Sequence, residues 1–73
     1  MTSFAELPKG QQIWEKMTTA ERDAIVAEVG GSYRTAEIAR TLRKAMAHIE
    51  ANADDFATVE ARETPDGYWN EKA

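Results

Sequence analysis

An uninterrupted stretch without glycine or proline, residues 32–64, constrains the fold of this chain most strongly. Within it, apolar residues recur at intervals of three and four, which places them on one face of an α-helix. These residues are Ile38, Leu42, Met46, Ile49, Ala53 and Phe56. The pattern predicts an amphipathic helix over about 35–56, with Asn52–Asp55 as the point where it is most easily interrupted.

A shorter helix is expected over about residues 8–17. Pro8 suits the first turn of a helix, because the N–H group that proline lacks has no partner there. Three apolar residues, Ile13, Trp14 and Met17, then follow at helical spacing. These residues supply a second apolar face for the core.

A further helix is expected over about residues 19–29. Thr18-Thr19-Ala20-Glu21 has the form of a capping box, in which threonine and glutamate side chains bond to exposed backbone N–H groups. Gly30-Gly31 ends this helix, because glycine adopts the left-handed conformation without steric cost. Ser32 or Thr35 is expected to cap the long helix that follows. The sequence therefore predicts an all-α fold, a small three-helix domain.

The last segment allows two alternatives. Thr64-Pro65-Asp66-Gly67 is a turn sequence. Thr58 and Val59 before it favour strand, as do Tyr68 and Trp69 after it, so a C-terminal turn or short hairpin over about 57–71 is one expectation. A flexible acidic tail over 57–73 is the other.

Size and composition exclude several classes of protein. The 73 residues suffice for one domain, 1–73, with a small core. Without cysteine the chain has neither disulfides nor thiolate metal ligands, and with His48 as its one histidine we expect no metal site. No basic, apolar leader opens the sequence and no run approaches the length of a membrane span, so we expect a cytoplasmic protein without membrane contact.

A small core favours stabilisation by a second chain. Positions 38, 42, 45, 49, 52 and 56 follow the alternating four-three spacing of a coiled coil, with Asn52 at one seam position. A homo-oligomer formed through the 38–56 helix is therefore a further expectation.

Catalytic motifs are missing. His48 falls on the flank of the long helix next to acidic residues, where a surface histidine is expected. Asp54 and Asp55 lie beside Glu50, but adjacent acids near a helix end usually cap helices or face water. Gly30-Gly31 lacks the lysine and the preceding strand of a phosphate-binding loop. We therefore expect no enzyme and no cofactor.

Charge is distributed unevenly along the chain. Residues 34–49 carry a net charge of +3, and residues 50–73 carry −5. The basic side chains are Arg34, Arg40, Arg43 and Lys44. They form either a solvated helix face or a docking patch, since arginine pairs with carboxylate or phosphate through two hydrogen bonds. Tyr68 and Trp69 are either the lid of the core or contact residues, because aromatics dominate binding energy when desolvated.

Part of the sequence resembles a known family. Thr19-Ala20-Glu21-Arg22-Asp23-Ala24-Ile25-Val26 is followed by Gly31-Ser32 and then by Glu37-Ile38-Ala39-Arg40-Thr41-Leu42. These residues resemble the helix-turn-helix in the C-terminal DNA-binding region of bacterial sigma factors. The family continues with a turn and a recognition helix, whereas this chain continues as Arg43-Lys44-Ala45-Met46. The resemblance implies a similar helix pair without the element that reads bases.

The sequence thus favours a non-enzymatic module for protein–protein binding, an adaptor, regulator or inhibitor. Its candidate contact residues are Arg34, Arg40, Arg43, Lys44, Tyr68 and Trp69. Two alternatives stay open. One is a helix-turn-helix-like DNA-binding regulator. The other is a phage-type acidic inhibitor, such as an anti-CRISPR protein, that occupies the nucleic-acid site of its target.

Overall fold

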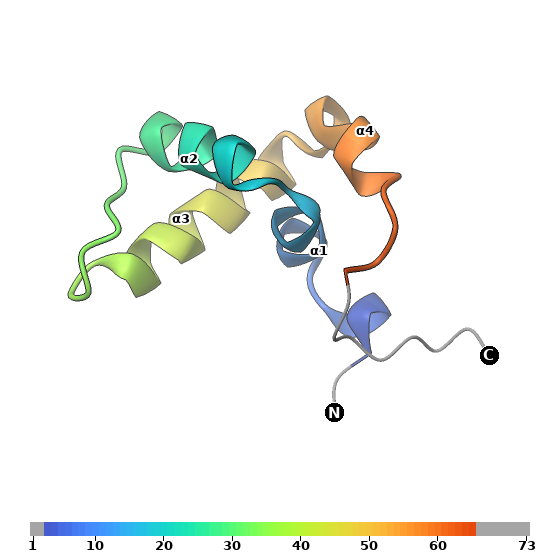
Figure 1. Cartoon of the computed structure of the whole chain (residues 1–73), viewed down its shortest axis with the longest axis horizontal. Coiled ribbons are helices and arrows are strands. Elements are labelled where there is room, and N and C mark those ends of the chain that lie inside the picture. Colours follow the sequence, from blue (N-terminus) through green and yellow to red (C-terminus); the bar gives the residue numbers. More distant parts are fainter. Residues whose placement is uncertain (1–2, 66–73) are drawn as a thin grey trace.

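The structure of the chain is a computed structural model, which describes residues 3–65 (Figure 1). The described elements are η1 (Phe4–Glu6), α1 (Lys9–Lys16), α2 (Thr19–Glu28), α3 (Ile38–Ala51), η2 (Ala53–Phe56) and α4 (Ala57–Glu60). The predicted all-α fold is confirmed, and residues 3–65 contain no β-strand. None of the described helices is long and apolar enough to cross a membrane.

The local signals at α2 act as the sequence predicts. Glu21 N–H donates to Thr18 Oγ1 (3.2 Å) and Thr18 N–H donates to the Glu21 carboxylate (2.8 Å), which completes the capping box. At the other end Gly30 has φ +67°, and Gly31 N–H donates to the Val26 carbonyl (2.9 Å). This pair of features is a Schellman motif, which reverses the chain after α2.

The long helix is shorter than predicted. Glu37 precedes α3 and makes no side-chain cap, so the predicted caps at Ser32 and Thr35 are wrong. The Ser32 hydroxyl accepts from Arg34 N–H (3.1 Å) inside the connecting loop instead. At its other end α3 stops at Asn52, the predicted weak point, where the side-chain amide donates to the His48 carbonyl (2.9 Å).

Residues 57–60 form α4 and not the first strand of a hairpin, which corrects that prediction. Val59 is only 7% exposed and belongs to the main core. Burying a valine side chain contributes about 1.5–3 kcal/mol. This outweighs the roughly 0.5 kcal/mol by which valine disfavours a helix. Tyr68 and Trp69 lie outside the described residues.

The core forms where α1 and α2 both contact α3 (Figure 1). Its buried residues are Ile13, Trp14, Met17, Ile25, Val26, Ala45, Ile49 and Val59. Ala45 and Ile49, two positions of the expected coiled-coil seam, are fully buried inside this chain. The middle of the seam is therefore covered by the chain's own core, and α3 ends before the last heptad position. The homo-oligomer through the 38–56 helix stays a prediction, and it would have to use other residues of the helix than Ala45 and Ile49.

Gly10 sets the close contact between α1 and α3. A Cβ atom at Gly10 would lie 2.5 Å from the Met46 carbonyl oxygen and 2.7 Å from Glu50 Cγ. Because the first of these atoms is helix backbone, a side chain at Gly10 forces the two helices apart.

Candidate functional site

The end of the molecule formed by the α2–α3 loop is its most exposed part. Figure 1 shows α2 and α3 moving apart toward this loop, at the left of the view. Every residue from Tyr33 to Arg40 is exposed. Tyr33 (53% exposed) and Ile38 (38% exposed) are the large hydrophobic residues that the described part of the chain leaves open to solvent. We call the segment of residues 33–38 the open tip.

Ile38 is exposed because of its place along α3. At 100° per residue it lies on the same side of the helix as Ala45 and Ile49, which are completely buried. It occupies the first position of α3, at the end where the two helices have separated (Figure 1). The apolar face of α3 therefore continues into solvent at the open tip.

Thr41 holds the base of the open tip against α3. Its side chain is almost fully buried, and its hydroxyl donates to the Ser32 carbonyl (2.9 Å) while accepting from Ser32 N–H (2.9 Å). A Cβ atom at Gly31 would lie 2.5 Å from Thr41 Cγ2, so only glycine fits there without a shift. These contacts fix where the loop leaves the core.

Tyr33 ties the open tip to α2. Its hydroxyl donates to the Asp23 carboxylate (2.5 Å), and this hydrogen bond raises the pKa of Tyr33. About half of Tyr33 nevertheless remains open to solvent, at 53% exposure. The loop is thus attached to both helices, which reduces the conformational entropy lost when it binds a partner.

The predicted basic residues all lie on the surface. Arg40 and Arg43 lie on the face of α3 opposite the buried Ala45, Lys44 lies on the flank of that face, and Arg34 lies in the open tip. Among residues 3–65, no carboxylate lies within ion-pair distance of any of these four side chains. We call the exposed side of α3 opposite the core the outer face.

The charge of the outer face changes from positive to negative along the helix. Beyond the exposed Ala47 it continues with Glu50 and Ala51, both exposed. Here an open depression of about 370 Å³ begins, lined by residues 50–55, which include Asp54 and Asp55. In the described part of the chain, no cluster of three or more acidic, histidine or cysteine side chains is arranged to hold a metal ion.

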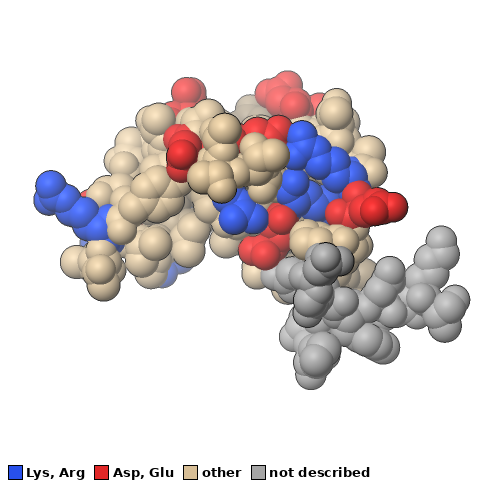
Figure 2. Space-filling view, in the orientation of Figure 1, with Lys and Arg blue, Asp and Glu red and all other residues tan. Residues whose placement is uncertain are grey.

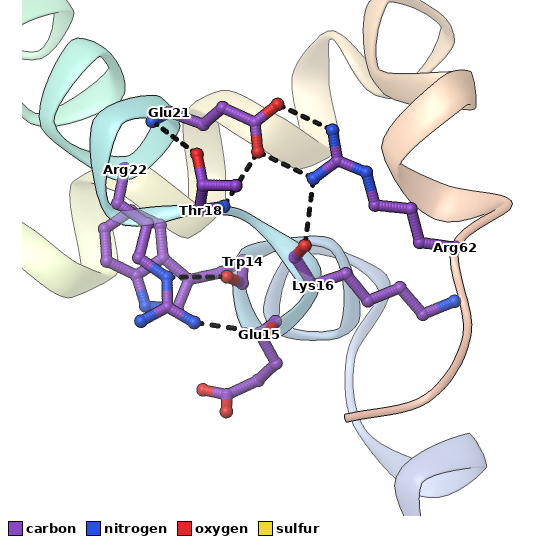
Figure 3. Close-up of polar contacts among 7 residues, drawn as sticks. All are labelled: Trp14, Glu15, Lys16, Thr18, Glu21, Arg22 and Arg62. Carbon is purple, nitrogen blue, oxygen red and sulfur yellow. Dashed lines mark hydrogen bonds and ion pairs between the residues drawn. The ribbon is translucent and has the colours of Figure 1, made fainter. Parts of the chain in front are cut away.

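A separate group of charged residues joins α1, α2 and the segment after α4 (Figure 3). Arg62 forms a two-pronged ion pair with Glu21 (2.7 and 2.8 Å) and also donates to the Lys16 carbonyl (3.1 Å). The hydrogen bonds from Arg62 and Thr18 lower the pKa of Glu21 to about 2. The capping-box glutamate therefore also holds a residue 41 positions away.

Arg22 closes the C-terminal end of α1. Its guanidinium donates to the carbonyls of Trp14 (2.9 Å) and Glu15 (3.2 Å) and lies 5.4 Å from the Trp14 ring centre (Figure 3). The last carbonyl groups of a helix lack partners within it and carry negative partial charge. Arg22 and Arg62 thus complete the end of α1.

Two lysines complete this charged region. Lys9 forms an ion pair with Glu60 (2.8 Å), and Lys16 donates to the Glu60 carbonyl (2.7 Å). Figure 2 shows basic and acidic side chains intermixed over α1 and α4, toward the right of the view. Because these side chains all have ion-pair or hydrogen-bond partners within the chain, we assign them to structure. Sequence reasoning identified Glu21 as a cap but missed Arg62, which no local motif marks.

Comparison of the chain with protein-family models, curated proteins and solved structures finds no significant match.

Proposed function

We propose that this protein is a non-enzymatic protein-binding module that docks a partner at the open tip. The observation that carries the proposal is the exposure of Tyr33, on a loop fixed to both neighbouring helices, together with that of Ile38 at the start of α3. Aromatic residues and arginine are enriched in protein interfaces, and a few such anchors supply most of the binding energy. The open tip combines a tyrosine, an isoleucine and Arg34 without a described ion-pair partner.

The chemistry of the open tip defines its partner. Ile38 and the Tyr33 ring require apolar surface to cover them, and Arg34 favours a carboxylate beside it. The partner is therefore a protein segment that presents an apolar side chain next to an acidic one. A module of this kind acts as an adaptor, regulator or inhibitor according to what else the partner binds.

DNA binding has less support from the geometry. The resemblance to sigma factors requires a turn and a recognition helix after Leu42, but α3 runs without a break to Ala51. The outer face also carries Glu50, and phosphate binding needs clustered positive charge. DNA binding is therefore a competing outcome of the experiment below.

An acidic inhibitor that imitates nucleic acid has partial support. Asp54, Asp55 and Glu63 are exposed, as that function requires. Glu60, however, already pairs with Lys9. This function is the second competing outcome.

The test compares two substitutions in the first turn of α3. Ile38→Asp places a charge on the apolar anchor, and Ala39→Asp places the same charge one residue later on another face. An acidic residue in the first turn is favourable for the helix, so both variants should keep their circular dichroism spectrum and stability. Each is used, with the wild type, to capture binding proteins from a nuclease-treated extract of the source organism or its host.

We expect the wild type and Ala39→Asp to retain the same protein, and Ile38→Asp to lose it. Equal retention by all three forms refutes docking at the open tip. A parallel capture from untreated extract serves as the control: if it recovers only nucleic acid, the DNA-binding alternative replaces the proposal. If a basic protein is retained by Ile38→Asp but lost on Asp54→Asn with Asp55→Asn, the acidic inhibitor replaces it.

A further inference from the structure

We propose that the open tip of one copy of this chain binds residues 66–73 of a second copy. The inference rests on the proposed function, because it uses the same docking surface, and it names one occupant for that surface. We call residues 66–73 the aromatic segment. Its sequence is Asp66-Gly67-Tyr68-Trp69-Asn70-Glu71-Lys72-Ala73.

The aromatic segment has the apolar groups that the open tip requires. Tyr33 and Ile38 are the large hydrophobic residues that the described part of the chain leaves exposed. Tyr68 and Trp69 are adjacent aromatic residues, a residue type that is enriched at the centre of protein interfaces. The two pairs therefore offer each other a cover from water.

The charges of the two surfaces are also complementary. Arg34 has no carboxylate within ion-pair distance among residues 3–65. Asp66 and Glu71 stand on either side of the aromatic pair, so one of them can meet Arg34 when the rings dock. Residues 33–40 carry two basic and one acidic side chain, whereas the aromatic segment carries one basic and two acidic ones.

The reach of the chain selects a second copy as the source of the aromatic segment. Figure 1 shows the described chain ending on the side of α1 and α4, away from the open tip. An extended chain spans about 3.4 Å per residue, so Trp69 lies within about 14 Å of Pro65. The molecule is 39 Å long, with the open tip at one end of that length (Figure 1). The aromatic pair therefore falls short of the open tip of its own chain.

Two copies can exchange their aromatic segments. Copies that lie side by side in opposite directions place each aromatic segment beside the open tip of the other, so both contacts form in one closed, twofold dimer. An aromatic side chain buries about 150–250 Å² when covered, so the two contacts stay near or below the roughly 1,200 Å² at which stable complexes begin. The dimer is therefore weak and depends on concentration. Because it occupies the open tip, it competes with any other protein that docks there.

The first test measures association of the purified chain by sedimentation equilibrium at up to about 1 mM. Ile38→Asp disables the open tip, and Tyr68→Ser with Trp69→Ser disables the aromatic segment. We expect the wild type and the control Ala39→Asp to dimerise equally, and each disabled variant to stay monomeric. A mixture of the two disabled variants keeps one of the two contacts, so it should associate at least about tenfold more weakly than the wild type.

The second test leaves both surfaces intact and uses the absence of cysteine from the chain. Ala36→Cys places a thiol in the open tip, and Asn70→Cys places one in the aromatic segment. With oxidised glutathione present, these two variants should form a mixed disulfide at least about tenfold faster than Asn70→Cys does with Ala27→Cys, an exposed control on α2.

A wild type that stays monomeric at about 1 mM overturns the proposal, whether the aromatic segment docks within its own chain or nowhere. A mixture of the disabled variants that fails to associate overturns it too, and so do equal disulfide rates for Ala36→Cys and Ala27→Cys. If the wild type is monomeric but Ile38→Asp still loses a protein captured from extract, this inference fails and the proposed function stands. If the dimer forms through the open tip and no other protein is captured, the proposed function fails and this inference stands.

Discussion

Replacing Thr41 with valine removes the hydroxyl that joins the open tip to α3 and keeps the size and shape of the side chain. Two hydrogen bonds are lost, one to the Ser32 carbonyl and one from Ser32 N–H, both 2.9 Å long. Ser32 is only partly exposed, so water replaces these bonds incompletely. Each such bond has a net worth of about 0.5–1.5 kcal/mol.

The expected loss of unfolding free energy is therefore about 2 kcal/mol. For a domain of this size, 1 kcal/mol corresponds to about 4–8 °C, so the melting temperature should fall by about 8–16 °C. Thermal and urea unfolding followed by circular dichroism measure this loss. Thr41→Ser keeps the hydroxyl and should lose less unfolding free energy than Thr41→Val. Thr35→Val is the matched exposed control and should stay within about 0.5 kcal/mol of the wild type.

The reasoning fails if Thr41→Val unfolds within about 0.5 kcal/mol of the wild type. It also fails if Thr41→Ser is destabilised as much as Thr41→Val, because the loss would then belong to the methyl group. If the hydroxyl acts as described and the open tip binds a partner, Thr41→Val should also weaken that binding, since the base of the open tip at Ser32 would no longer be held against α3.

Two other predictions follow from the packing and the ion pairs. Gly10→Ala should destabilise the domain by about 1–3 kcal/mol in urea unfolding, because the added methyl group meets the Met46 carbonyl. A stability equal to that of the wild type would disprove the close contact. Glu21 has a pKa of about 2 in the folded chain and near 4.5 when unfolded, so the unfolded chain binds the proton first as the pH falls. The stabilisation by Glu21 should be complete above pH 4.5 and be lost as the pH falls toward 2. Glu21→Gln should reduce this pH dependence of the unfolding free energy. Glu28→Gln, an exposed control on the same helix, should leave it unchanged.

Some features of the fold could be predicted because short-range interactions decide them. The capping box of Thr18 and Glu21 and the left-handed Gly30 involve residues within one helical turn, and both appear in the structure as expected. The same holds for the interruption at Asn52 and for the basic side of α3, which follows from helical period alone. The open tip was anticipated only in part, because Arg34 was identified and the exposure of Tyr33 and Ile38 was not.

By itself, then, the sequence determined the three main helices, their approximate ends and the charged outer face, since 3.6-residue periodicity and local hydrogen bonds are encoded in adjacent residues. Only the tertiary structure decided which part of the apolar stripe is covered, burying Ile49 and leaving Ile38 in solvent. It also paired Arg62 with Glu21 across 41 residues and made a helix of a segment containing Val59. Such outcomes depend on which surfaces meet in space, and no local pattern in the sequence carries that information.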